Sequence, residues 1–220
     1  MTYSIVVPIY NEHENIPELF RRLRPVINAL DGQAEVIFVD DGSGDDSFPL
    51  LLDLHRQDPR FKAISFSRNF GHQVAFTAGI EHATGDAVIL MDGDLQDPPE
   101  VLSLFIAKWK EGFDVVYAIR KKRKENILKR AAYASFYRIL KRLSYLDIPL
   151  DSGDFCLMDK RVVETLRRLP ERNRFVRGLR TWAGFRQVGA KRGKIGHPLP
   201  GVCVRIVDPE TSAPLPVGQP

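Results

Sequence analysis

Short apolar runs rich in β-branched residues alternate, over residues 1–118, with segments in which apolar residues recur at helical spacing. The short runs predict strands, most of them buried, over residues 4–8, 35–39, 61–67, 87–91 and 114–118. The intervening segments predict helices, over residues 14–30, 46–55, 74–83 and 100–111. This alternation is typical of an α/β fold whose mainly parallel central sheet is flanked by helices.

The pattern changes in the second half of the chain. Residues 126–146 predict a basic amphipathic helix, with Leu128 and Leu143 on its apolar side. Such a helix either lies on an anionic membrane surface or packs on the domain with its basic side in water, and the pattern favours neither. Residues 151–155 are predicted as a loop that leads into a strand, and residues 160–169 as a short helix.

Three polar clusters follow directly on predicted strands. They are Tyr-Asn-Glu at 10–12, Asp-Asp at 40–41 and Asp-Gly-Asp-Leu-Gln-Asp at 92–97. In a parallel sheet the carboxyl ends of the strands meet at one edge, and ligands bind outside that edge. We therefore expect the three clusters to converge on a single site.

The third cluster carries oxygen ligands that suit a hard divalent cation. Asp92, Asp94 and Asp97 supply carboxylates and Gln96 supplies an amide. Mg²⁺ or Mn²⁺ commonly binds a few carboxylates, while waters and substrate phosphates complete the shell. Gly93 allows a tight turn between two of the acids. Acidic turns that are merely solvated are common, and only the position at a strand end favours a ligand site here.

The acidic turn at residues 40–46 differs from a calcium loop. It lacks the spacing of an EF-hand, and Leu51 and Leu52 stand where the closing glutamate is expected. An acid at a strand end can accept hydrogen bonds from a base or a ribose, so this turn is predicted to bind a nucleoside. The sequence contains neither a Gly-x-Gly-x-x-Gly fingerprint nor a phosphate-binding P-loop.

Composition and charge narrow the class of protein. With 44% hydrophobic and 27% charged residues, the 220-residue chain is an ordinary globular sequence, which excludes collagen-like and wholly disordered proteins. The net charge of +4 conceals an asymmetry, since residues 1–118 hold 9 basic and 19 acidic residues and residues 119–220 hold 23 and 9. An acidic half suits a cation and a basic half suits phosphates or anionic lipid. Two solvated surfaces of opposite charge are the simpler alternative.

Targeting signals and cysteines favour a cytoplasmic location. No apolar run reaches the roughly 18 residues of a spanning helix, and the first predicted strand follows no leader-like segment. Cys156 and Cys203 form no Cys-x-x-Cys motif, which argues against a disulfide framework and against a zinc site. A reducing compartment is therefore expected.

Five motifs, in this order along the chain, resemble those of family 2 glycosyltransferases. They are Ser-Ile-Val-Val-Pro-Ile-Tyr-Asn-Glu at 4–12, Val-Asp-Asp-Gly-Ser at 39–43, Asn-Phe-Gly-His-Gln at 69–73, Asp-Gly-Asp-Leu-Gln-Asp-Pro-Pro-Glu at 92–100 and Ser-Gly-Asp-Phe at 152–155. The resemblance covers residues 3–189 and is strongest to the polyprenyl-phosphate sugar transferases, with the bactoprenol glucosyltransferases closer than the dolichol-phosphate mannosyltransferases. Gly93 is a mild departure, because alanine is usual there.

This resemblance implies a fold and a donor site. The fold is the GT-A (nucleotide-diphospho-sugar transferase) fold, and the donor is a nucleotide sugar that is used with inversion at the anomeric carbon. Pro8, Tyr10, Glu12 and Asp40 are the implied nucleoside-binding residues, and Asp41 would support their turn. The alternative for Asp41 is that it binds only backbone amides.

The resemblance also implies the catalytic and metal-binding residues. Asp92 would orient the donor, and Asp94 and Gln96 would bind the divalent cation, Mg²⁺ or Mn²⁺. Asp154 matches the family's acid near the sugar, where it would act as a base or anchor a hydroxyl group. The alternative for Asp154 is that it only caps a turn.

A polyprenyl-phosphate acceptor would be anionic before it reacts. Its attack then needs positioning and relief of charge repulsion more than a strong general base. The basic half supplies candidates for binding the acceptor phosphate: Arg120 and Arg130 first, because a guanidinium matches phosphate oxygens, with Lys121 and Lys129 next to them. The helix at 126–146 would then rest on the bilayer surface.

Two regions are expected within the chain. Residues 1–190 are predicted to form the GT-A catalytic domain, which includes the basic helix at 126–146. The family pattern ends near Ala190, and residues 193–216 resemble a fragment of an adenylate-forming acyl ligase. Residues 191–220 are too few for a core of their own and are expected to be an atypical tail, not an independent domain.

These features predict an enzyme that moves a hexose, glucose from UDP-glucose, onto undecaprenyl phosphate. It would be cytoplasmic and peripheral on the inner face of the cell membrane, and a homo-oligomer is left open. Two alternatives stand: an impaired nucleotide-sugar-binding remnant that lacks the family's C-terminal membrane segment, and a mannosyltransferase that uses GDP-mannose. Nucleic acid is not an expected partner, because aromatic residues do not interleave with the basic ones.

Overall fold

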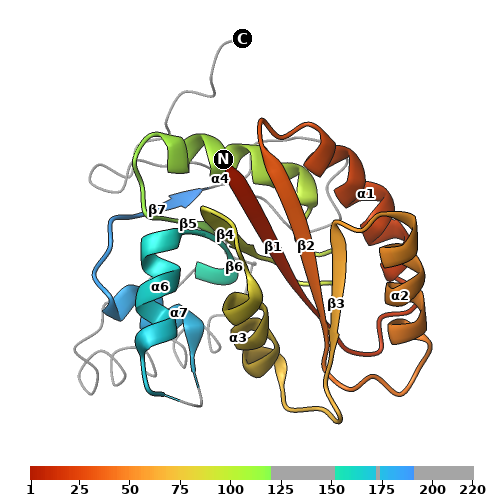
Figure 1. Cartoon of the computed structure of the whole chain (residues 1–220). Helices are drawn as coiled ribbons and strands as arrows, with labels where there is room; N and C mark the ends of the chain where they lie inside the picture. Colours follow the sequence, from red (N-terminus) through yellow and green to blue (C-terminus); the bar gives the residue numbers. More distant parts are fainter. Residues whose placement is uncertain (120–151, 172–173, 191–220) are drawn as a thin grey trace, which may run out of the picture.

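The computed structural model describes residues 1–119, 152–171 and 174–190. Its strands form one sheet of order β3-β2-β1-β4-β6-β5-β7 (Figure 1). They are β1 (Thr2–Ile9), β2 (Gln33–Asp40), β3 (Phe61–Ser65), β4 (Ala87–Leu90), β5 (Val115–Ile119), β6 (Ser152–Asp159) and β7 (Gln187–Ala190). The helices are α1 (Ile16–Asn28), α2 (Ser47–Gln57), α3 (His72–His82), the 3₁₀ turn η1 (Pro99–Val101), α4 (Leu102–Lys110), α6 (Lys160–Arg168) and α7 (Val176–Trp182).

The first four strands form the parallel part of the sheet. β1 pairs in parallel with β2 on one side and with β4 on the other, and β2 pairs in parallel with β3. β6 runs antiparallel to both β4 and β5, and β7 runs parallel to β5. The predicted α/β fold with a mainly parallel sheet is confirmed, and the reversed β6 carries its first residues to the edge where β4 ends.

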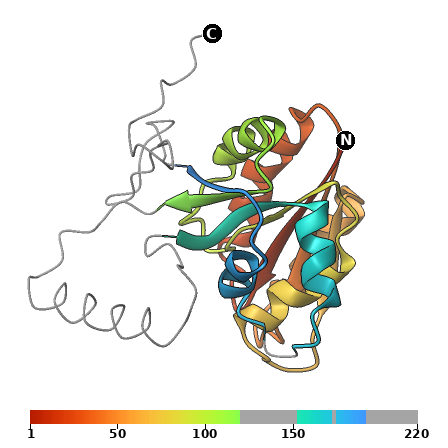
Figure 2. The same cartoon turned by 90° about the vertical axis from the view of Figure 1, so that its left-hand side faces the viewer.

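Helices cover the sheet on both faces (Figures 1 and 2). Consecutive residues of a strand point to opposite faces, so Val7 packs in the core beneath α1, α2 and α4, whereas Val6 packs in the core beneath α3, α6 and α7. Burial on both faces explains the unbroken apolar run of β1. Gly79 allows α3 to approach closely, since a Cβ there would lie 2.0 Å from Cγ1 of Val6.

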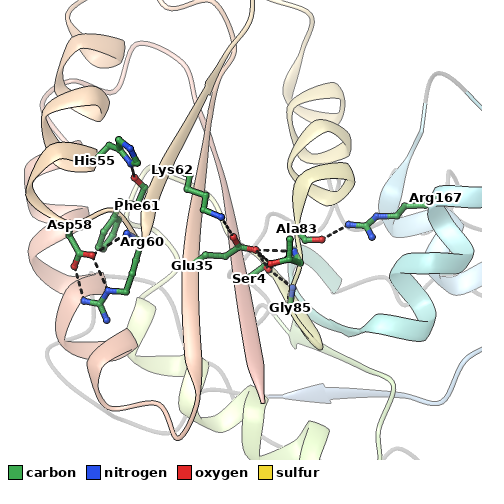
Figure 3. A network of polar contacts seen from close by, with 11 residues as sticks. Ser4, Glu35, His55, Asp58, Arg60, Phe61, Lys62, Ala83, Gly85 and Arg167 are labelled. Atoms are coloured by element: carbon green, nitrogen blue, oxygen red, sulfur yellow. Dashed lines mark hydrogen bonds and ion pairs between the residues drawn. The ribbon is translucent and has the colours of Figure 1, made fainter.

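A buried polar network ties the beginnings of β1, β2 and β4 together. The carboxylate of Glu35 is 9% exposed and accepts hydrogen bonds from the Ser4 hydroxyl at 2.6 Å and from the Thr84 backbone N–H at 2.9 Å. Lys62 of β3 adds an ion pair at 2.6 Å (Figure 3). The network satisfies a buried charge at the edge of the sheet opposite the strand ends where the acidic clusters lie.

Several sequence predictions fall outside the described residues. The basic helix at 126–146, the four basic candidates for binding the acceptor phosphate and the tail at 191–220 all lie there. Within residues 1–119, 152–171 and 174–190, no helix combines the length and the apolar character needed to span a bilayer.

Candidate active site

The carboxyl ends of β1, β2 and β4 meet at one edge of the sheet. Ile9 pairs with Asp40, and the backbone N–H of Asp41 donates to the carbonyl oxygen of Ile9 at 2.8 Å. On the other side of β1, the N–H of Met91 donates to Val6 at 3.1 Å. The three acidic and polar clusters therefore leave the sheet side by side, as the strand order requires.

The loops after β1 and β2 interlock. The side-chain oxygen of Asn11 accepts a hydrogen bond from the Gly44 N–H at 2.8 Å, and the backbone N–H of Asn11 donates to the Ser43 hydroxyl at 3.0 Å. Glu12 donates its backbone N–H to the Ser47 hydroxyl at 2.9 Å. Asn11 adopts a φ of 54°, a left-handed conformation that asparagine tolerates. These contacts join residues 10–15 and 41–47 into one rim of the site.

The predicted donor-binding residues contribute to this rim in different ways. Pro8 lies within β1 and is buried. Tyr10 is 48% exposed, which leaves its ring available to a ligand. Glu12 accepts a hydrogen bond from the side chain of Asn15. Asp40 is buried and accepts from the Ser43 N–H at 3.2 Å, so it closes the turn that follows β2.

Asp41 supports a loop on the other side of the site. Its carboxylate is 3% exposed and accepts hydrogen bonds from the backbone N–H groups of Phe70 at 2.7 Å and Gly71 at 2.9 Å. Both oxygens are thus engaged by the chain itself, as in the backbone-amide alternative for this residue. The loop that Asp41 holds leads directly into α3.

His72 opens α3 and pairs with the first acid of the cluster after β4. Its Nε2 lies 2.8 Å from Oδ1 of Asp92. This hydrogen bond raises the pKa of His72 against the opposing effect of burial, and the charges of Asp92, Asp154 and Asp41 raise it further. Asp92 contacts the imidazole directly, whereas Asp154 and Asp41, from two other segments of the chain, act on it only through their charge.

Asp154 lies within β6, not in the loop predicted over residues 151–155. The antiparallel register joins Leu90 to Cys156, so β6 brings Asp154 to the end of the sheet at which β4 stops, two residues before Asp92. The carboxylate of Asp154 accepts from the side chain of Gln73 at 3.3 Å and pairs with Arg177 at 3.4 Å. The reversed strand thus adds an acid from a fourth segment of the chain to the edge at which the clusters of the parallel strands lie.

Consecutive residues of α3, His72 and Gln73, contact Asp92 and Asp154 respectively. The side-chain oxygen of Gln73 also accepts the backbone N–H of Val176 at 3.1 Å, which anchors the start of α7. The motif at 69–73 belongs to the family resemblance, but no role for its residues was predicted from the sequence. The signal was the position of the motif between two acidic clusters, but the contact itself is set by the tertiary fold.

Asp94 and Gln96 occupy a tight turn after β4. Leu95 between them has a φ of 61°, and Oδ1 of Asp94 accepts the backbone N–H of Gln96 at 3.0 Å. Within the described residues, no three His, Cys, Asp or Glu side chains are grouped so that they could hold a metal by themselves. A pair of oxygen donors at a strand end fits a cation whose shell is completed by waters and substrate phosphates.

Comparison with known proteins identifies the family. The family model for Glycosyl transferase family 2 matches residues 4–167. The chain belongs to this family. The matched segment includes the acids at 40–41, 92–97 and 154 and the His-Gln pair of α3, and it ends before α7.

Curated relatives of this glycosyltransferase include bacterial and phage proteins. An uncharacterized glycosyltransferase, YkcC, of Bacillus subtilis is 50% identical over 190 residues, which are 86% of this chain and 59% of that protein. A bactoprenol glucosyl transferase of Shigella phage SfX is 42% identical over 185 residues, 84% of this chain and 61% of that protein. The chain spans about three fifths of the length of these relatives.

Solved structures confirm the GT-A glycosyltransferase fold. The mannosyltransferase PcManGT from Pyrobaculum calidifontis, in complex with GDP-Man and Mn²⁺, has a TM-score of 0.61 at 19% identity, covering 96% of this chain and 58% of that one. Glucosyl-3-phosphoglycerate synthase from Mycobacterium tuberculosis, with Mn²⁺ and UDP-glucose, has a TM-score of 0.51 at 19% identity, covering 73% and 57%. At this identity the likeness establishes the fold alone.

In this family 2 glycosyltransferase, α7 lies against the part of β6 that carries Asp154. Arg180 donates from Nη2 to the carbonyl oxygen of Gly153 at 3.1 Å, and its guanidinium lies 5.4 Å from the centre of the Tyr117 ring. Burial raises the pKa of the neighbouring Cys156 thiol, although Arg180 opposes that rise. A thiol in this state is a packing group, not a nucleophile.

Proposed function

We propose that the enzyme transfers a hexose, glucose from UDP-glucose, to a polyprenyl phosphate, with undecaprenyl phosphate as the expected acceptor. The 42% identity to bactoprenol glucosyl transferases supports this choice of acceptor and sugar. The observation that carries the proposal is that consecutive residues of α3, His72 and Gln73, contact Asp92 and Asp154, at the strand ends where the clusters at 10–12 and 40–41 also leave the sheet. Such an edge of a parallel sheet is where α/β enzymes bind nucleotides.

In this proposal the rim binds the nucleoside of the donor. Tyr10 offers an exposed ring, and the buried Asp40 shapes the turn beneath it. Pro8 in β1 and Glu12 in the loop that follows β1 would contribute to the same binding region, while Asp41 would act indirectly through the loop at 70–71. The nucleoside would therefore lie above β1 and β2, with its diphosphate directed toward the acids that follow β4.

Asp92 and Asp154 would then face the sugar. Asp92, held by His72, would orient the donor, and Asp154 would lie near the anomeric carbon, where the acceptor arrives. Attack by a phosphate oxygen from the side opposite the leaving diphosphate inverts the anomeric centre. That oxygen is already ionised near neutral pH, so positioning contributes more than proton transfer.

A divalent cation, Mg²⁺ or Mn²⁺, belongs to the proposal. Asp94 and Gln96 would hold it, because they are the oxygen donors in the turn after β4. When bound, the cation would offset the negative charge that develops on the leaving diphosphate. The two residues themselves would fix where the diphosphate lies relative to Asp92.

The acceptor side includes residues outside the described structure. Arg120, Arg130, Lys121 and Lys129 are proposed to attract the lipid phosphate, and the helix at 126–146 is proposed to lie on the cytoplasmic face of the membrane. The charge of residues 119–220, 23 basic against 9 acidic, supports contact with an anionic surface. Residues 1–190 are proposed as the catalytic domain, with residues 191–220 as an appended tail.

A transfer assay tests the proposal. Vesicles containing undecaprenyl phosphate are incubated with the full chain, Mg²⁺ and either labelled UDP-glucose or labelled GDP-mannose, and label is measured in the lipid fraction. Label from UDP-glucose that disappears with a chelator is the expected result. Label from GDP-mannose alone would replace the glucose assignment with the mannose alternative.

Matched acidic variants distinguish site chemistry from general charge. Asp94→Ala is expected to abolish transfer and the metal-dependent rise in thermal stability with UDP-glucose. Asp53→Ala removes an acid that is exposed on α2, far from this edge, and should leave both unchanged. Metal-dependent nucleotide binding without any transfer would contradict the proposal and favour the remnant alternative.

A further inference from the structure

Arg180 is a buried cation with unused hydrogen-bond donors. Its side chain is 1% exposed, and its Nη2 donates to the carbonyl oxygen of Gly153. Within the described part of the chain, Nε and Nη1 have no hydrogen-bond partner. Gly153 precedes Asp154, so the guanidinium of Arg180 contacts the backbone next to that acid.

Such a group is costly in a folded protein. A buried guanidinium loses its hydration, and unpaired N–H groups add to that loss. Natural proteins retain buried unsatisfied polar groups mainly where a water, an ion or a reacting group meets them. Because the group is a cation with two free N–H donors, an anion such as a phosphate is the ligand that matches it best.

A second arginine on the same helix strengthens this assignment. Arg177 lies one turn before Arg180 and is 27% exposed along its side chain. Its contact with Asp154 measures 3.4 Å, longer than the 2.7 Å between Arg174 and Glu81 and than the about 2.7–2.9 Å usual for charged pairs. A second contact, from Nε of Arg177 to Oδ1 of Asp154, is also 3.4 Å long, so Asp154 holds this guanidinium through two long contacts for which an arriving anion can compete.

We propose that Arg177 and Arg180 form a subsite for the phosphate group of the lipid acceptor, and that Asp154 acts there as a positioning residue for Arg177. This inference rests on the proposed function, and it adds two cations from α7, a helix that lies beyond the segment matched by the family model. In the transfer step, a bond forms between a phosphate oxygen of the acceptor and the anomeric carbon. The bond from that carbon to the leaving diphosphate breaks, and no proton needs to move.

The two cations would reduce the charge repulsion that opposes the reaction. A phosphate and a diphosphate repel each other, and the acids along this edge repel both. Two guanidinium groups beside Asp154 would offset this repulsion at the point where the acceptor must approach. Arg177 would bind the arriving phosphate at the partly exposed end of the subsite, and Arg180 would fix it from below.

Binding of a short acceptor tests the inference without requiring transfer. Farnesyl phosphate, farnesol and inorganic phosphate are titrated separately into the full chain by calorimetry, and UDP-glucose with Mg²⁺ is titrated as an independent ligand. The variants are Arg177→Gln and Arg180→Met, and the matched control is Arg186→Gln, an exposed arginine that stacks on Phe113. Methionine replaces a buried ion with an apolar chain of similar length, a change that proteins often tolerate.

We expect wild type to bind farnesyl phosphate, and each α7 variant to weaken that binding at least about ten-fold, the loss of one charge-assisted contact. Arg186→Gln should stay within about two-fold, and the affinity for UDP-glucose should stay within about two-fold in every variant. If Arg180→Met does not fold, the partly exposed Arg177→Gln decides the question. Unchanged affinity for farnesyl phosphate in Arg177→Gln, or an equal loss of UDP-glucose binding, would overturn the subsite.

The other ligands separate the sources of binding. If farnesol binds as tightly as farnesyl phosphate, the protein recognises the lipid tail and not the phosphate, which would overturn the subsite. If inorganic phosphate binds as tightly as farnesyl phosphate, the assignment to a lipid acceptor would be overturned. A protein that transfers no sugar yet binds farnesyl phosphate through Arg177 and Arg180 would refute the proposed function and retain the subsite. Sugar transfer together with an unaltered affinity for farnesyl phosphate in both variants would retain the proposed function and refute the subsite.

Discussion

Replacing Asp41 by alanine removes the acceptor that fixes the loop before α3. Two backbone N–H groups, those of Phe70 at 2.7 Å and Gly71 at 2.9 Å, donate to this carboxylate. A hydrogen bond to a charged group contributes about 1.5–3 kcal/mol, so the pair contributes about 3–6 kcal/mol. Because Phe70 is exposed, its released N–H can reach water, and the lower end, about 3 kcal/mol, is expected.

Urea unfolding followed by tryptophan fluorescence measures this loss of unfolding free energy. Asp41→Asn should cost roughly half as much, because its amide oxygen can still accept one of the two bonds. Asp46→Ala is the matched control, since Asp46 precedes α2 without a side-chain capping bond and should change stability by less than about 0.5 kcal/mol. A loss below about 1 kcal/mol in Asp41→Ala, with unchanged hydrogen exchange at Phe70 and Gly71, would refute the reasoning.

Two further predictions concern pH. Burial raises the pKa of Glu35, but hydrogen bonds, led by that from Lys62 (Figure 3), outweigh it and lower the pKa to about 2. The lowered pKa stabilises the folded state by about 3 kcal/mol above pH 4.5, and this stabilisation is lost as pH falls toward 2. Between pH 7 and 3, the unfolding free energy of the wild type should therefore fall more steeply than that of Glu35→Gln. Equal slopes for the two proteins would contradict this prediction. Asp92 raises the pKa of His72, so this pair stabilises the folded protein below pH 6.5 and the stabilisation is lost as pH rises through the raised pKa. The loss of unfolding free energy should be below about 1 kcal/mol, because the His72 side chain is half exposed, and it should be absent in His72→Gln. An equal loss in the variant would exclude His72 as its source.

Local pattern was sufficient for the parallel part of the fold. β1, β2 and β4 are buried on both faces, so their apolar runs are nearly unbroken and easily found. The predicted strands and helices of residues 1–118 all occur, with shifts of a few residues at their ends. The family motifs lie in this same region, which is why fold and family were predictable together.

The local sequence pattern could not predict the direction of β6 or the presence of the short elements β7 and α7. β6 is apolar like its neighbours, and nothing in its own residues states that it runs antiparallel to β4 and β5. β7 has only four residues and α7 only seven, lengths at which periodicity carries little signal.

The same distinction explains the site. Convergence of the clusters at 10–12, 40–41 and 92–97 follows from strand order in any parallel sheet, so the sequence sufficed for it. The contacts of His72 with Asp92 and of Gln73 with Asp154 depend on how α3 packs against the ends of β4 and β6, which is a tertiary property. The unpaired donors of Arg180 depend likewise on the docking of α7.

The central claim is that acids from separate strand ends surround one nucleotide sugar and its cation. Crystals grown with UDP-glucose and Mn²⁺, measured for anomalous scattering at the manganese edge, test it most directly. The account predicts a manganese peak within bonding distance of Asp94 and Gln96, with uridine against Tyr10 and Asp40 and glucose between Asp92 and the strand that carries Asp154. Manganese or uridine at any other edge of the sheet would contradict it.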